Sequence, residues 1–220
     1  GGEATNTIFG YQAGNSIHAS SGMNTFVGHQ VADATMTADA DENTAVGHLA
    51  LSGLTSGEKN IAIGSYTGIN IITGDENVLI GRSAGNNHNS SDLVAVGTAA
   101  LASISNATAD GTVAVGYNAL TALTSGERNL AIGYQSLYQA DECDDSIAIG
   151  YQALGGTDSG TNVKNIAIGN YALDAALANS QHNIAIGYNA LTAATGGQSN
   201  VAIGGSGAGG AITTADKIVA

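Results

Sequence analysis

The sequence predicts an all-β protein: a parallel β-solenoid of about twelve coils of 16–19 residues, spanning residues 1–220 as a single repeat array. Three observations support this prediction. One glycine recurs at a nearly constant spacing, a short apolar segment precedes each copy of it, and Pro is absent. Internal repeats of this kind are typical of solenoids, in which each unit covers its neighbour. The absence of Pro favours strands that pair on both sides, because Pro cannot donate to a β-ladder.

The recurring glycine follows two or three apolar residues and separates two short segments of each repeat. Successive copies are 16 to 19 residues apart, which is too regular for chance. Glycine permits a tight bend or a close approach of two backbones. The copies are Gly10, Gly28, Gly47, Gly64, Gly81, Gly97, Gly116, Gly133, Gly150, Gly169, Gly187 and Gly204.

The segment before each glycine is expected to form the first strand. NLAIG (129–133) and NIAIG (183–187) alternate large and small apolar residues, a pattern typical of a strand with two unequal faces. Asn side chains that stack from coil to coil are expected to hydrogen-bond along the solenoid axis, and we prefer this interpretation to ligand binding. The copies that carry Asn four residues before the glycine are Asn6, Asn24, Asn43, Asn60, Asn77, Asn129, Asn165, Asn183 and Asn200.

The segment after each glycine is expected to form a second short strand. It often begins with Tyr, usually has Ala three residues after the glycine, and has Leu four residues after it in seven copies. The rest of each repeat is a polar turn such as LTSGEKN (54–60), and these turns carry nearly all the charged residues. A coil with so few large apolar side chains buries too little surface alone, so stacked coils must cover one another.

Both faces of the first strand look apolar, one lined by Ile and Val and the other by Ala. We expect the Ile/Val face to fill the interior of the coil. The Ala face then needs another partner, and a column of small residues lets a second backbone approach closely. The pattern therefore predicts lateral association with identical chains, most simply as a homotrimer.

The charge balance excludes several partners. Five basic residues stand against eighteen acids, and the formal net charge is −13. Such a surface repels phosphate backbones and anionic lipids, so we expect no nucleic-acid partner. No apolar stretch reaches the length of a membrane span, and we expect no membrane insertion. The sequence lacks an initial Met and stops just before the next expected glycine, which suggests an excerpt of a longer fibrous protein.

The repeats resemble two families of surface proteins. NTAVG (43–47), NIAIG (60–64, 165–169 and 183–187) and NVAIG (200–204) resemble the head repeats of YadA-type trimeric autotransporter adhesins. Copies with Tyr after the glycine, then Ala-Leu and a TSGE turn, resemble collar and shaft repeats of bacteriophage tail fibres. Both resemblances imply a trimer of left-handed parallel β-rolls at a virion or cell surface. The period is longer than that of the compact adhesin repeat, and Ile8, Phe26 and Leu79 stand where Ala is usual.

Few residues are candidates for a functional site. Tyr117, Tyr134 and Tyr151 occupy the same column in consecutive coils and either contact a receptor, for example sugar rings, or pack between chains. His29 and His48 share that column and should lie within reach of each other, but no further metal ligand is in register. We therefore predict no metal site, no cofactor and no catalytic residue.

Other motifs are better explained by the repeat. The acidic turn 141–145 lacks the spacing of known calcium loops and is interpreted as solvated, and it surrounds Cys143, whose nucleophilicity the acids would reduce. Residues 205–210 match GxGxxG without a following helix, so we discard a dinucleotide site. IGYQAL (149–154) resembles the hexapeptide of left-handed β-helix acyltransferases, but it occurs once per coil rather than three times.

These observations favour a structural or adhesive function over catalysis. The leading hypothesis is a segment of a phage tail fibre or similar virion appendage, involved in host attachment at the virion tail or an extracellular surface. The first alternative is the head of a bacterial trimeric surface adhesin. The second is a β-helix enzyme such as an acyltransferase or polysaccharide lyase.

Overall fold

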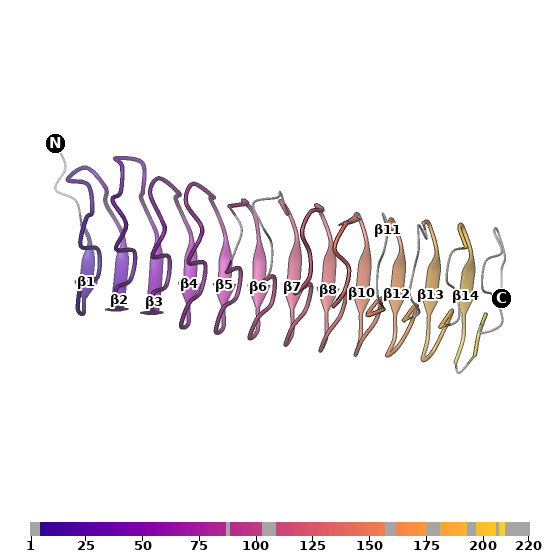
Figure 1. The fold of residues 1–220 in the computed structure, drawn as a ribbon. Coiled ribbons are helices and arrows are strands. Elements are labelled where there is room, and N and C mark those ends of the chain that lie inside the picture. Colours follow the sequence, from indigo (N-terminus) through magenta and orange to yellow (C-terminus); the bar gives the residue numbers. More distant parts are fainter. Residues whose placement is uncertain are drawn as a thin grey trace. The chain divides into compact units, whose positions relative to one another are not determined.

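The computed structural model describes residues 5–86, 89–102, 109–156, 162–174, 181–192, 197–205 and 207–209. These residues form an all-β structure without any helix, a parallel β-solenoid in which each repeat makes one turn (Figure 1). The predicted fold class is therefore confirmed, but the expectation of a second short strand after each glycine is wrong, because in the described repeats those residues form turns. The contacts divide the chain into two compact units, residues 1–111 (unit 1) and 112–220 (unit 2).

Each unit contains one main sheet of six parallel strands that follow one another in chain order (Figure 1). In unit 1 the strands are β1 (Thr7–Phe9), β2 (Thr25–His29), β3 (Thr44–His48), β4 (Ile61–Ile63), β5 (Val78–Ile80) and β6 (Val94–Val96). In unit 2 they are β7 (Val113–Val115), β8 (Leu130–Ile132), β10 (Ile147–Ile149), β12 (Ile166–Ile168), β13 (Ile184–Ile186) and β14 (Val201–Ile203). A second small sheet in unit 2 pairs β9 (Cys143–Asp144) with β11 (Asn162–Val163).

The register of the main sheets places equivalent repeat positions side by side. Ala45 of β3 pairs with Ala62 of β4, and Ala148 of β10 pairs with Ala167 of β12. Because side chains alternate between the two faces of a strand, a slip by one residue would exchange the faces. The repeat period predicted from the sequence is therefore the stacking period within each unit.

The interior of each turn is filled mainly by Ala and Leu, and the Ile and Val residues of the main-sheet strands lie on the outside. Ala62, in the middle of β4, is fully buried, whereas its neighbours Ile61 and Ile63 are 38% and 41% exposed. The same alternation recurs in the other strands of both units, from β2 onward. The expectation that Ile and Val fill the coil and that Ala forms a contact between chains is therefore wrong. The reason is space, because Leu four residues after the glycine already fills the narrow interior opposite the strand.

Two interior columns compensate each other in side-chain volume: the mid-strand residue and the residue four positions after the glycine. Most turns combine Ala in mid-strand with Leu four residues after the glycine, as in Ala131 with Leu137. Where the mid-strand residue is larger, the second position is smaller: Phe26 is fully buried and stands in a turn with Ala32. Leu79 likewise stands in a turn with Gly85, and it also fills the space next to Gly68 of the preceding turn, where a Cβ would lie 2.9 Å from Cδ1 of Leu79. The unusual residues of the early repeats are thus compensated within the core.

The recurring glycines stack backbone on backbone. Gly133 has a φ of +136°, which L side chains rarely adopt, and a Cβ there would lie 2.3 Å from the carbonyl oxygen of Gly150 in the next turn. Gly64 meets Gly81 in the same way, at 2.5 Å. Any side chain at this column would separate the turns.

The Asn column is a buried hydrogen-bond ladder, as the sequence predicted. The Oδ1 of Asn43 accepts hydrogen bonds from the backbone N–H and the side-chain Nδ2 of Asn60, both at 3.0 Å. The Nδ2 of Asn60 also donates to the carbonyl of Gly74 at 2.9 Å. Ser146 stands in place of Asn, and its Oγ accepts from the N–H of Asn165 at 3.2 Å. The column therefore satisfies buried polar groups, which explains it without a ligand.

Candidate functional site

In unit 2 the tyrosines that follow the glycines form a ladder of stacked rings, here called the tyrosine ladder. The ring centroids of Tyr117 and Tyr134 are 5.2 Å apart with planes at 15°, and those of Tyr134 and Tyr151 are 5.2 Å apart at 5°. These three side chains are 47%, 44% and 39% exposed. The structure thus brings the predicted residues together on an accessible edge. Because Tyr134 is stacked on both sides, it offers solvent mainly its ring edge and hydroxyl rather than a free face.

The tyrosine ladder is longer than the sequence predicted. Tyr171 stands two residues after its glycine instead of one, yet its ring lies 5.2 Å from that of Tyr151 and 6.2 Å from that of Tyr188. Partial desolvation, together with the neighbouring Tyr151, raises the pKa of Tyr171 above its ordinary value. In this repeat Asn170 occupies the position directly after the glycine, and Tyr171 follows one position later. A search for Tyr at either position would have found it. Its ring nevertheless stacks in the same column.

The corresponding column of unit 1 combines tyrosine and histidine, and is here called the mixed ladder. The ring of His29 lies 5.1 Å from that of Tyr11 and 5.2 Å from that of His48, and His48 meets Tyr66 at 5.0 Å. The prediction that His29 and His48 lie within reach of each other is confirmed. Tyr66, like Tyr171, was missed because it stands one position later.

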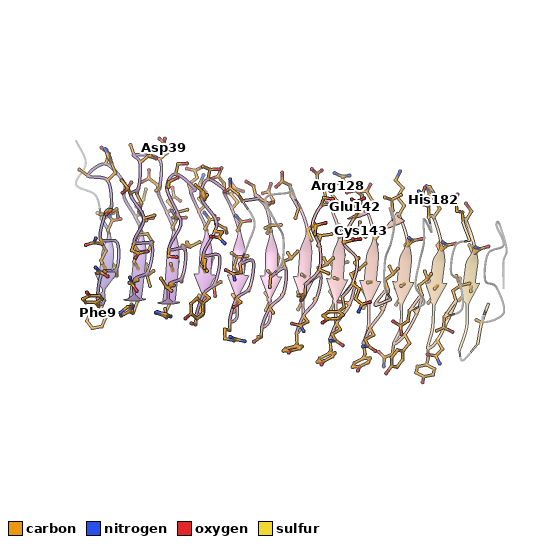
Figure 2. All side chains as sticks on the ribbon, viewed as in Figure 1. Phe9, Asp39, Arg128, Glu142, Cys143 and His182 are labelled. Atoms are coloured by element: carbon orange, nitrogen blue, oxygen red, sulfur yellow. The ribbon has the colours of Figure 1, made fainter. Side chains whose placement is uncertain are left out.

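Charged residues gather in the turns that precede the strands. In unit 1, Asp39 lies at the edge opposite Phe9, which ends β1; in unit 2, Arg128, Glu142 and His182 lie in these turns (Figure 2). Several acids serve the turns themselves. The Oδ1 of Asp75 accepts from the backbone N–H of Glu58 at 2.8 Å, and the Oδ1 of Asp144 does the same for Glu127 at 2.8 Å. These carboxylates therefore act as links between neighbouring turns.

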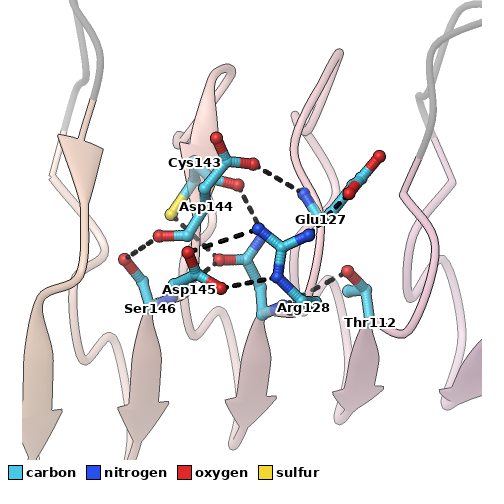
Figure 3. A network of polar contacts seen from close by, with 8 residues as sticks. Thr112, Glu127, Arg128, Cys143, Asp144, Asp145 and Ser146 are labelled. Carbon is cyan, nitrogen blue, oxygen red and sulfur yellow. Dashed lines mark hydrogen bonds and ion pairs between the residues drawn. The ribbon is translucent and has the colours of Figure 1, made fainter.

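Arg128 is the centre of a polar network that joins its own turn to the acidic turn 141–145 of unit 2 (Figure 3). Its Nε and Nη2 donate to the two carboxylate oxygens of Asp145 at 2.7 and 3.3 Å, and its Nη1 donates to Glu127 at 2.6 Å. These hydrogen bonds hold the pKa of Asp145 below its ordinary value. Cys143 is buried beneath this network, with its Sγ 3.4 Å from Oδ1 of Asn129. Burial keeps this thiol away from solvent.

The remaining candidates form no cluster of metal ligands. Throughout the described ranges, no group of three or more His, Cys, Asp and Glu side chains could hold a metal ion. His18 accepts a hydrogen bond from the N–H of Ser20 at 3.2 Å, and the N–H of His182 donates to the carbonyl of Val163 in the preceding turn. His88 lies outside the described residues, as do Ser206 and Gly210 of the GxGxxG match.

The outer face of each main sheet carries two columns of partly exposed apolar residues, here called the Ile/Val face. They are the first and third residues of each strand, and in these positions no charged residue occurs. In unit 2 the columns are Val113, Leu130, Ile147, Ile166, Ile184 and Val201, and Val115, Ile132, Ile149, Ile168, Ile186 and Ile203. In unit 1 the first three strands begin with Thr, and the columns become apolar from β4 onward. A contiguous apolar surface of this kind is typical of an interaction site.

In the part of the chain that the structure describes, no helix is long and apolar enough to cross a membrane. Comparisons with protein-family models, with curated proteins and with solved structures found no match to this chain.

Proposed function

We propose that the chain is a structural and adhesive segment of a phage tail fibre or similar virion appendage, and that it assembles as a parallel homotrimer. The observation that carries this proposal is the Ile/Val face, which is apolar, free of charge and repeated at the pitch of the turns. A second copy in parallel orientation presents columns of the same pitch and the same side chains. Burying Ile and Val away from water then supplies the association energy, at roughly 25 cal/mol per Å².

The distribution of charged residues supports a place for the proposed fibre on the outside of a virion. The described acids lie outside the main-sheet strands, where they keep the outside soluble and deter edge-to-edge contacts between chains. The function of such a segment is mechanical and non-catalytic, because continuous backbone ladders resist bending and buried Asn columns hold the turns in register. The head of a bacterial trimeric adhesin remains the alternative, since the same repeats suit both.

The test is the oligomeric state in solution. We expect analytical ultracentrifugation of the full chain to give the mass of three chains. Ile132→Lys with Ile168→Lys places two charges on the Ile/Val face and should release single chains that keep their β-sheet circular dichroism. Ser199→Lys is the matched control, because Lys59 and Lys164 already stand at the equivalent turn position. Sedimentation of the unaltered chain as a monomer, or of the double variant as a trimer, would refute the proposal.

Host contact is proposed for the tyrosine ladder, with Tyr117, Tyr134 and Tyr151 meeting a receptor, for example a cell-surface glycan. Their exposure in a row of hydroxyls and ring edges supports this contact. Binding of the chain to host cells should fall when all three are replaced by Ala. The control is Tyr138→Ala, which removes a half-buried tyrosine four residues after Tyr134 that does not belong to the tyrosine ladder. This variant should leave binding unchanged. Equal binding by both variants would exclude the ladder.

A further inference from the structure

The mixed ladder of unit 1 contains a pair of histidines that the proposed function does not use. His29 and His48 end β2 and β3 and are register partners in the parallel sheet. Their backbones are held by the ladder, because the carbonyl of His29 accepts from the N–H of Leu49 at 3.0 Å and that of His48 from Tyr66 at 2.8 Å. Regular β-structure therefore sets the distance between the two imidazoles.

We propose that His29 and His48 form a binding site for a late first-row divalent cation such as Cu²⁺ or Ni²⁺. Their ring centroids are 5.2 Å apart, with planes at 51°. Two imidazoles that bind one cation in neighbouring positions at about 2.0–2.1 Å have ring centres roughly 4.5 Å apart in square-planar geometry and roughly 5 Å apart in tetrahedral geometry. His29 is exposed and His48 is half-buried, so both rings are accessible from solvent. The spacing of neighbouring turns therefore places the two imidazoles at a separation that one cation can bridge.

The choice of cation follows from the ligand set. Within the described ranges no third His, Cys, Asp or Glu joins the pair, so water or a group from a partner fills the other positions. Ca²⁺ and Mg²⁺ need several oxygen ligands and are excluded by this set. Imidazole suits Cu²⁺, Ni²⁺ and Zn²⁺, and affinity for a given site is highest for Cu²⁺. A net charge of −13 also raises the local concentration of cations.

The neighbouring tyrosines make the pair more rigid. Tyr11 stacks on His29 at 5.1 Å with planes at 28°, and Tyr66 meets His48 edge-on at 5.0 Å. These contacts restrict rotation of both imidazoles, which lowers the entropy cost of binding. In unit 2, Tyr117 and Tyr134 have the same 5.2 Å separation but no nitrogen ligands. Tyr117 and Tyr134 are therefore an internal control for the histidine pair, with the same ring spacing and no metal-binding nitrogen.

The experiment is a Cu²⁺ titration of the full chain. Calorimetry measures the affinity and the number of equivalents, and electron paramagnetic resonance identifies the ligands of the copper. We expect one tight equivalent with two nitrogen ligands on the copper. His29→Asn or His48→Asn should weaken this binding by about tenfold or more. His29→Tyr with His48→Tyr keeps an aromatic ladder like that of unit 2 and should abolish the site. Circular dichroism and thermal unfolding without metal establish that each variant is folded.

Two further variants make the result decisive. His182→Asn removes a histidine from a turn that lacks a second imidazole in register and should leave the tight equivalent intact. Tyr117→His with Tyr134→His should create a second equivalent in unit 2. The proposal is overturned if the variant with His29→Tyr and His48→Tyr still binds copper as the unaltered chain does. It is also overturned if His182→Asn lowers the affinity as much as His29→Asn.

Discussion

Units 1 and 2 have the same backbone but differ in what each column of the turn displays. Both have six parallel strands, stacked glycines and a buried Asn ladder. Unit 1 begins three strands with Thr, places Phe26 and Leu79 in its core, and pairs two histidines on its aromatic edge. Unit 2 has Ile, Val or Leu on the outer face, Ala throughout mid-strand and tyrosine along the edge. The glycine column is therefore uniform, whereas the core, the outer face and the aromatic edge vary between the units.

The largest expected effect concerns the uniform positions. Gly64→Ala in unit 1 and Gly133→Ala in unit 2 should each lower the free energy of unfolding by ~3 kcal/mol or more, because both force a Cβ against a carbonyl of the next turn at a disfavoured φ. Thermal and denaturant unfolding measure the loss. Gly205→Ala is the control, since its Cβ would meet nothing within 4 Å. Unequal losses in the two units would show that their backbones are not equivalent.

The next effect concerns the core, where the two units use different residues. Gly68→Leu should lower the free energy of unfolding by ~2 kcal/mol, because the new side chain overlaps Leu79. Leu79→Ala alone should cost ~3 kcal/mol by leaving a cavity. The double variant gives the turn of Ala62 the Ala and Leu pattern of unit 2 and removes the closest of the side chains that surround Gly68. We expect it to recover at least ~1 kcal/mol relative to the sum of the single losses. Additive losses would contradict the exchange of volume between the columns.

The smallest effect concerns charges at one turn position, where unit 1 has Lys59 and unit 2 has Arg128. Arg128 lowers the pKa of Asp145, so this contact stabilises above the unfolded-state pKa of about 3.9 and is lost as the pH falls below it. Hydrogen bonding to Glu58 raises the pKa of Lys59, so that contact is lost as the pH rises above about 10.4. Asp145→Asn should reduce only the acid dependence of the melting temperature, and Lys59→Gln only the alkaline dependence. Both shifts should be small, because these side chains are exposed. An acid dependence that persists unchanged in Asp145→Asn would exclude this pair as its cause.

The sequence could predict every feature that depends on the period of the repeat. The glycine spacing determines which residues share a column, so the Asn ladder, the neighbouring tyrosines and the His29–His48 pair could all be derived from it. Parallel stacking aligns equivalent positions of successive turns in one column along the axis. This can be predicted without knowing which way each side chain points. Tyr66 and Tyr171 were missed because they depart from the column by one residue in the sequence, although their rings stack in it.

Tertiary packing alone decided which face of the strand lies inside. Ala and Ile alternate in the same way whichever face is buried, so hydrophobicity alone favoured the larger residues for the core. The interior, however, is bounded by Leu from the opposite side of the turn, and the space left admits only Ala unless that Leu is replaced by a smaller residue. The apolar Ile and Val columns are consequently on the outer face, where they become the surface that a partner can cover.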